Sequence, residues 1–98
     1  MAAKNFSVSQ DDHGIYHLHG ELSIHELDDL RGFLEQSLEE EQETAISLAK
    51  VTFIDTAALQ LLIAFKKQFQ PKAKLRISDI SSEVEKILSL CGLKPALL

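Results

Sequence analysis

The 98-residue sequence holds one cysteine and no apolar stretch long enough to span a bilayer. One cysteine excludes an internal disulfide, and proteins without disulfides are typical of the reducing cytosol. This cysteine, Cys91, lies between leucines, a pattern that predicts a thiol on the inward face of a helix. No secretory signal is recognisable before Phe6, so we expect a cytoplasmic protein without direct membrane insertion.

Basic residues are the minority, with 10 Lys and Arg against 15 Asp and Glu and a formal net charge of −5. Nucleic-acid binding needs a positive patch that displaces counterions, so this balance argues against a nucleic-acid partner. Some bases do cluster around one predicted helix end and the strand after it, where cations stabilise a helix C-terminus. They are Lys66, Lys67, Lys72, Lys74 and Arg76. The remaining composition is that of an ordinary globular protein, so we expect a single domain over residues 1–98.

Alternating polar and apolar residues predict two strands at the start of the chain. In residues 4–10, Phe6 and Val8 face one side, and residues 15–19 show the same period of two. Residues 11–14 between them consist of turn-forming types, including two aspartates and a glycine. Two strands joined by a tight turn form an antiparallel hairpin.

Three later segments have the spacing of amphipathic helices. The first begins at Ser23, which forms a capping box with Glu26, an arrangement in which each side chain satisfies a free backbone N–H. The second covers residues 56–69, and the third begins at Ser82, with Glu85 completing a second capping box. The inward stripes of the three helices are Ile24, Leu27, Leu30, Leu34 and Leu38; then Leu59, Leu62 and Ile63; then Val84, Ile87, Leu88 and Cys91.

Two more strands complete the pattern. Residues 44–48 and 74–78 alternate inward and outward positions, and Val51 and Phe53 continue the first pattern toward Asp55. The order of elements is β-β-α-β-α-β-α, in which each helix after the hairpin can join parallel strands by a right-handed crossover. We therefore predict an α/β fold: a mixed sheet of about four strands, an N-terminal antiparallel hairpin and three flanking helices.

The segment with the most functional information is Asp55-Thr56, where a strand ends and a helix begins. Asp55 can act as the N-cap, because its carboxylate can accept the N–H two or three residues later. Thr56 would then be the first helical residue, with its hydroxyl near the surface at the positive end of the helix dipole. Such a position tolerates a phosphate, whose charge of about −1.5 to −2 would repel or block a docked partner. The same pair of residues is also common as a simple helix cap.

Three segments resemble the STAS domain of bacterial anti-sigma-factor antagonists. They are Gly20-Glu21-Leu22 after the hairpin, Ile46-Ser47-Leu48, and Val51-Thr52-Phe53-Ile54-Asp55-Thr56-Ala57-Ala58-Leu59. The resemblance extends over about residues 5–95, and the STAS fold that it implies, a small sheet flanked by helices, matches the order derived above. Two positions depart from the family motif, which commonly has serine in place of Thr56 and has glycine in place of Ala58.

The resemblance implies a non-enzymatic regulator that docks onto an anti-sigma kinase of the histidine-kinase-like ATPase type. In this family the phosphorylated residue directly follows the aspartate of the motif, which assigns phosphorylation to Thr56. The resemblance also implies that this serine/threonine phosphorylation controls release, and that a separate phosphatase removes the phosphate. The implied partner-binding residues are Asp55, Thr56, Ala57, Ala58, Leu59 and Gln60.

The same resemblance has a second branch. Stand-alone STAS proteins of similar length are subunits of a phospholipid-trafficking ABC transporter, in which the Asp-Thr segment docks onto the ATPase. A related alternative is an adaptor beside chemotaxis or other two-component signalling proteins. Thr56 fits each of these, so the sequence leaves the partner open: an anti-sigma kinase with its phosphatase, an ABC transporter ATPase, or a chemotaxis or two-component signalling protein.

Two other kinds of site compete with a docking surface. Four histidines are candidate metal ligands, namely His13, His17, His19 and His25. Only two of them share a strand face, and no third ligand has a recognisable spacing. Asp55 and Asp79 both follow strands, where α/β sheets form active sites, so a small enzyme with paired carboxylates is the other alternative. Because phosphate-loop, zinc and nucleophile motifs are all missing, we expect no cofactor, no metal and no catalytic residue.

Overall fold

The computed structural model describes residues 6–40, 43–68 and 74–98. Its elements follow the predicted order, with a short 3-10 turn before the first α-helix and a short fourth helix at the end. They are β1 (Phe6–Gln10), β2 (Tyr16–Leu22), η1 (Ile24–Glu26), α1 (Leu27–Glu40), β3 (Glu43–Ile54), α2 (Thr56–Gln68), β4 (Lys74–Ile80), α3 (Ser82–Cys91) and α4 (Lys94–Leu97). No helix in these ranges has the length and apolar character needed to cross a membrane.

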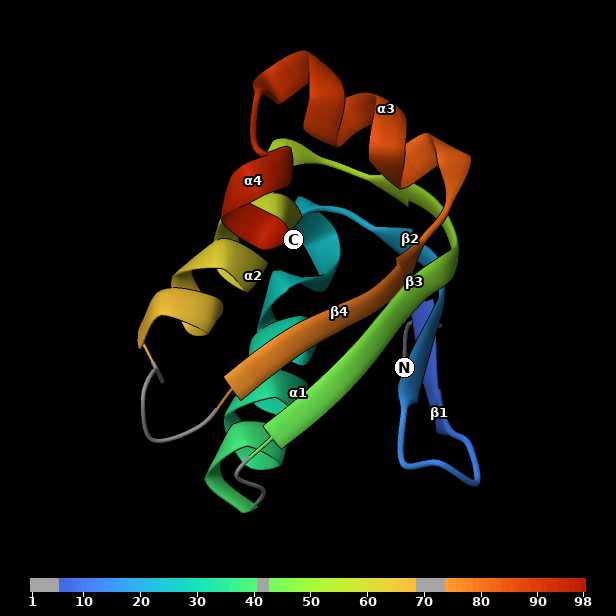
Figure 1. Cartoon of the computed structure of the whole chain (residues 1–98), viewed down its shortest axis with the longest axis vertical. Coiled ribbons are helices and arrows are strands. Elements are labelled where there is room, and N and C mark those ends of the chain that lie inside the picture. Colours follow the sequence, from blue (N-terminus) through green and yellow to red (C-terminus); the bar gives the residue numbers. More distant parts are fainter. Residues whose placement is uncertain (1–5, 41–42, 69–73) are drawn as a thin grey trace.

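The strands form one mixed sheet in the order β1-β2-β3-β4. β1 and β2 pair antiparallel, from Phe6 opposite Gly20 to Gln10 opposite Tyr16, which confirms the predicted hairpin. β3 pairs in parallel with both β2 and β4, so α1 and α2 are crossover helices. Figure 1 shows α1 and α2 together on one face of the sheet, with α3 across the end of β3. The predicted α/β fold is therefore confirmed.

β3 is longer than the predicted strand over residues 44–48 and continues to Ile54. Its second half pairs with β2 and contains the buried residues Val51 and Ile54. The register between β2 and β3 shifts along this pairing, and the buried positions of this half, Val51 and Ile54, are three residues apart instead of two. As a result Phe53, predicted to continue the apolar pattern, is 46% exposed.

The connection between β2 and α1 differs from the predicted helix start. Ser23 caps η1: its Oγ accepts a hydrogen bond from His25 N at 3.3 Å and donates one to Glu26 Oε2 at 2.6 Å. The α-helix begins only at Leu27, so Ser23 and Glu26 form a side-chain hydrogen bond in place of the predicted capping box. Ile24, predicted to lie in the inward stripe, is 61% exposed because it belongs to this turn.

α3 also begins differently from its prediction. Its N-cap is Ser81, whose Oγ accepts a hydrogen bond from Val84 N at 3.2 Å, so the predicted box of Ser82 and Glu85 does not form the cap. The same hydroxyl donates to Val51 O at 2.7 Å, 30 residues earlier in the chain. Ser81 is the better cap because it both starts the helix and fastens it to β3, a contact that local spacing does not reveal.

The end of α3 corrects the prediction for Cys91, whose side chain is exposed. The buried residues of this helix are Val84 and Leu88, and Cys91 is its last residue, so the packed face ends before the thiol. Gly92 then reverses the chain with a left-handed φ of 67°. The segment after it packs back onto the domain, and Leu97 is fully buried.

The basic cluster predicted near the end of α2 lies only partly within the described ranges. Lys66 and Lys67 are in the last turn of α2, where cations stabilise a helix C-terminus. Arg76 on β4 contacts Glu43 on β3, with Nε 3.4 Å from Oε1. Several other predictions fall outside the described residues: the start of the first strand at residues 4–5, the end of the second helix at residue 69, Lys72, and the side chains of Leu38 and Lys74.

Candidate functional site

The predicted site residues lie together where β3 ends and α2 begins. Thr56 is the first residue of α2 and is exposed, and Gln60, about one turn later, is also exposed. The residues on either side of Thr56 are partly exposed. Ala58 and Leu59 are fully buried, so they belong to the core beneath the site, and the surface is formed by the other members of the predicted set.

Asp55 holds the start of two helical elements. Its Oδ1 accepts a hydrogen bond from Ala58 N at 2.9 Å, which confirms the predicted N-cap of α2. Its Oδ2 accepts a hydrogen bond from Ile24 N at 2.7 Å, 31 residues earlier in the chain. The Asp55 N–H donates to Leu22 O at 3.1 Å and ties the end of β3 to the end of β2. One carboxylate therefore fixes η1 beside the first turn of α2.

The surroundings of Thr56 combine a positive backbone potential with the acidic side chain of Asp55. The N–H groups in the first turn of α2 and the helix dipole both favour an anion at this position. Asp55, the residue directly before Thr56, supplies a carboxylate. A phosphate on Thr56 would therefore be stabilised by the helix and would add to the negative charge presented to a partner.

Ile24 is a neighbour of this site that sequence reasoning missed. Its N–H is bound by Asp55, and its side chain is 61% exposed. No local pattern indicates the contact, because the β2–η1 and β3–α2 junctions meet only after the two strands pair. The one usable signal is the predicted parallel sheet itself, since Leu22 and Ile54 end their strands side by side.

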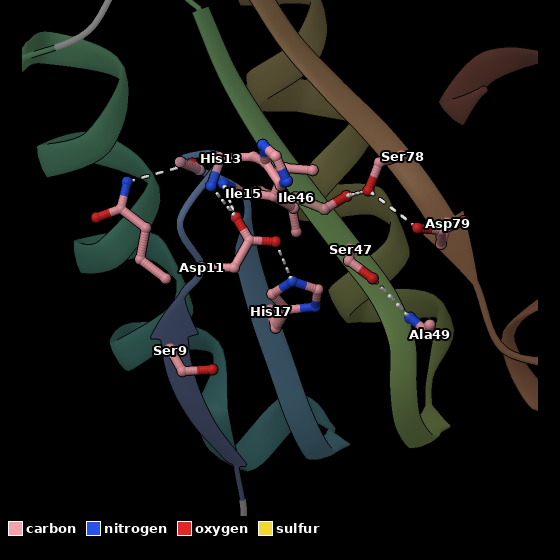
Figure 2. A network of polar contacts seen from close by, with 12 residues as sticks. Ser9, Asp11, His13, Ile15, His17, Ile46, Ser47, Ala49, Ser78 and Asp79 are labelled. Atoms are coloured by element: carbon pink, nitrogen blue, oxygen red, sulfur yellow. Dashed lines mark hydrogen bonds and ion pairs between the residues drawn. The ribbon is translucent and has the colours of Figure 1, made fainter.

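Two of the four histidines considered as metal ligands, His17 and His19, are held by polar neighbours on the hairpin. His17 Nε2 is hydrogen-bonded to Asp11 Oδ2 at 2.8 Å (Figure 2), and His19 Nε2 lies 3.0 Å from Ser9 Oγ. Among the residues that the structure describes, no group of three or more potential ligands could hold a metal ion. The contacts of His17 and His19 are those of side chains that fasten an edge hairpin.

Asp11 organises the turn of that hairpin. Its Oδ1 accepts hydrogen bonds from the backbone N–H groups of His13 at 2.9 Å and Ile15 at 3.0 Å, while Oδ2 meets His17 (Figure 2). The hydrogen bond with His17, followed by that of the Ile15 N–H, lowers the pKa of Asp11 below its ordinary value. This carboxylate therefore has a structural task at the end of the sheet opposite Thr56.

Asp55 and Asp79 do not form the carboxylate pair that an enzyme would need. Asp79 lies opposite Ser47 in the pairing of β3 with β4, and its Oδ2 accepts a hydrogen bond from Ser78 Oγ at 3.5 Å (Figure 2). Ser47 lies in the first half of β3, whereas Asp55 follows the last residue of that strand, where its carboxylate binds Ala58 N and Ile24 N. The two carboxylates therefore have separate partners, and no contact between them is found among the described residues.

Solved structures with the same fold include anti-sigma-factor antagonists. One from Mycobacterium paratuberculosis has a TM-score of 0.76 at 16% identity and covers 97% of this chain and 86% of its own. The antagonist SpoIIAA in its unphosphorylated form has a TM-score of 0.69 at 17% identity, with 95% and 85% covered. The Bacillus cell fate determinant SpoIIAA in its phosphorylated form has a TM-score of 0.63 at 16% identity, with 95% and 88% covered.

These identities establish a shared fold and nothing finer. No curated protein matches the chain. The family model described as STAS domain matches residues 7–97, which span both the hairpin and the Asp55–Thr56 junction. The resemblance seen in the sequence is thereby confirmed, and this chain belongs to the STAS domain family.

Proposed function

We propose that this chain is a regulatory protein-binding module that docks onto an ATPase-fold serine/threonine kinase, in the manner of an anti-sigma-factor antagonist, and is released by phosphorylation of Thr56. The observation that carries the proposal is the exposed position of Thr56 at the start of α2, directly after the capping Asp55. The proposal assigns the chain to the cytoplasm, gives it no catalytic residue, and requires a phosphatase to restore docking.

The similar structures support a phosphate switch on this fold. SpoIIAA has been solved in an unphosphorylated and in a phosphorylated form, and both share the fold of this chain. A phosphate on that protein is therefore compatible with the same arrangement of sheet and helices. We extend this compatibility to Thr56, because its hydroxyl is exposed and lies at the favourable end of a helix.

The expected switch is electrostatic and steric. The kinase would transfer the γ-phosphoryl group of ATP to Thr56 Oγ1, with release of ADP and of the hydroxyl proton. The phosphate then adds about −1.5 to −2 charges next to Asp55 and enlarges the side chain that the partner contacts. Asp55 already holds both neighbouring helical starts, so the modification needs no rearrangement of the fold.

A phosphorylation assay with the purified chain and purified kinases tests the proposal. The chain is incubated with ATP and each ATPase-fold anti-sigma kinase of its organism, and intact mass and peptide mapping locate any phosphate. We expect one phosphate on Thr56 and none in Thr56→Val. Thr52→Val is the matched control, because Thr52 is also exposed but lies within β3. The proposal is wrong if no such kinase phosphorylates the chain, or if Thr56→Val is phosphorylated as well as the parent.

A second candidate function uses the same surface without phosphate: a constitutive, non-catalytic subunit of a phospholipid-transport ABC ATPase complex, or an adaptor for two-component signalling. It is favoured by the observation that Asp55 fixes η1 and α2 in the unmodified chain, so the surface is already formed. Co-purification with an ABC ATPase that is lost in Thr56→Glu would support it. Recovery of an ATPase-fold anti-sigma kinase together with phosphate on Thr56 would remove it.

A further inference from the structure

The two edge strands of the sheet are protected to different degrees against pairing with another strand. β4, at one edge, carries the charged residues Arg76 and Asp79, and charge on an edge strand opposes such pairing. β1, at the other edge (Figure 1), contains no charged residue and no proline, and its register with β2 runs without a bulge. Since these are the usual means of blocking an edge, β1 is the less protected of the two.

The hydrogen bond that closes the hairpin shows which backbone groups of β1 point outward. Asp11 N donates to Ile15 O at 3.0 Å, so these two residues form a hydrogen-bonded pair. Hydrogen-bonded and non-hydrogen-bonded pairs alternate along an antiparallel ladder, so Ser9 and Ser7 also bond to β2. The residues whose N–H and C=O groups point away from β2 are Phe6, Val8 and Gln10. No described residue outside the hairpin bonds to these groups.

This pattern of outward groups is complementary to itself. When two copies of β1 run antiparallel with Val8 opposite Val8, Phe6 of each copy lies opposite Gln10 of the other. Every pair of opposed outward residues can then exchange both of its backbone hydrogen bonds. The pairing has two-fold symmetry, which is the commonest symmetry of oligomers built from identical chains. A second copy of the chain therefore satisfies all the outward groups of β1 at once.

The side chains of β1 are compatible with the same register. Val8 is 38% exposed, and its counterpart in the second copy would cover it. The chain has a net charge of −5, but no charged side chain of β1 would oppose a like charge in this pairing. Asp11, the first charged residue after the strand, is already bound by its own turn and by His17.

From these observations we infer that β1 is a self-association edge, through which two copies of this chain join their sheets in a reversible dimer centred on Val8. Only one strand of five residues forms the contact, so the dimer belongs to the class of small, weak interfaces. The inference is independent of the proposed function, because Thr56 follows β3, which β2 separates from β1.

Sedimentation velocity from about 10 µM to about 1 mM tests the inference, and we expect a dimer with a Kd on the order of 100 µM. Val8→Pro removes the central outward N–H while leaving the bonds to β2, and is expected to weaken the dimer about tenfold or more. Val8→Thr is the matched control, because it keeps the shape and the N–H, and should stay within about threefold. NMR spectra establish that the hairpin is intact. A parent that remains monomeric at about 1 mM overturns the inference.

Disulfide trapping tests the register without relying on the proline variant. In a Cys91→Ser background, Val8→Cys should form a covalent dimer on mild oxidation, because opposed Cα atoms in a hydrogen-bonded pair are about 5.5 Å apart. Ser7→Cys is the control, since Ser7 would face Ser9 of the other copy and lie roughly 7–8 Å from its own counterpart. Mixing Ser7→Cys with Ser9→Cys should restore the link. Equal trapping of Val8→Cys and Ser7→Cys would disprove the proposed pairing.

Discussion

Two aspartates at opposite ends of the sheet, Asp11 and Asp55, both accept hydrogen bonds from backbone N–H groups. Their partners lie at very different distances along the chain. Asp11 accepts hydrogen bonds from the N–H groups of His13 and Ile15 and meets the ring of His17. All three partners lie within six residues of it. The hairpin turn is therefore a local structure that its own few residues specify.

Asp55 also accepts two backbone hydrogen bonds, but only one of them is local. Ala58 N is three residues later, whereas Ile24 N is 31 residues earlier, on the other side of a strand crossover. The second bond forms only when β2 and β3 pair with the correct register. The local aspartate shapes a turn, and the long-range aspartate joins two segments into one surface.

Replacing Asp55 is expected to give the largest loss of stability among the polar variants. Asp55→Ala removes a helix cap and a charged hydrogen bond to η1, which together are worth about 2 to 3 kcal/mol of unfolding free energy. Urea unfolding measures the change. Asp79→Ala is the control, since Asp79 is exposed, and is expected to change stability by less than about 0.5 kcal/mol. A loss of about 1 kcal/mol would match the cap alone and show that the bond to η1 is not maintained in solution, and a loss equal to that of Asp79→Ala would contradict both contacts.

The two neighbouring serines at the start of α3 sharpen the same contrast at a smaller scale. Ser81→Ala removes a cap to Val84 N and a bond to Val51 O, and we expect a loss of about 1 to 2 kcal/mol. Ser82→Ala is expected to stay within about 0.5 kcal/mol, because Ser82 is exposed and its Oγ bonds only to the side chain of Glu83 among the described residues. Thermal unfolding distinguishes the two, and a larger effect at Ser82 would restore the capping box predicted from spacing.

The contrast between local and long-range bonds also explains which predictions from the sequence were right. Element order, the hairpin and the N-cap at Asp55 depend on residues close in sequence, and all are confirmed. The errors lie where distant segments decide the outcome. Ser81 displaces Ser82 as the cap because its hydroxyl reaches Val51, and Ile24 leaves the helix stripe because Asp55 holds it in a turn.

The candidate site shows the same division. The exposed position of Thr56 followed from the boundary between strand and helix, which the spacing of apolar residues defines. Ala58 and Leu59 are 0% exposed, as helical spacing requires for the face of α2 that packs on the core. The resemblance to the family motif assigned them to the partner-binding surface because it does not distinguish buried from exposed neighbours of Thr56. Ile24 could be placed beside the site only by combining the sheet order with the register of β2 and β3.

The smallest expected effect concerns the local aspartate and depends on pH. The pKa of Asp11 in the folded chain is lowered, chiefly by the hydrogen bond with His17, so its contribution to stability is present above the unfolded value of about 3.9. That contribution is lost as the pH falls through the lower folded pKa. Asp11→Asn keeps an oxygen acceptor for the turn but removes the charge, so its melting temperature is expected to lie below that of the parent at neutral pH.

The difference in melting temperature between Asp11→Asn and the parent should shrink as the pH falls from about 5 toward 3 and vanish below the folded pKa. Asp12→Asn is the matched control, because Asp12 is the exposed neighbour in the same turn and removes an equal charge. A difference that is flat with pH, or that is equal for Asp11→Asn and Asp12→Asn, would mean that general surface charge and not the contact with His17 acts on the hairpin. Because this contact closes within six residues, Asp11→Asn should change the pH dependence of stability equally in the parent and in an Asp55→Ala background, in which the long-range bond to Ile24 is already lost.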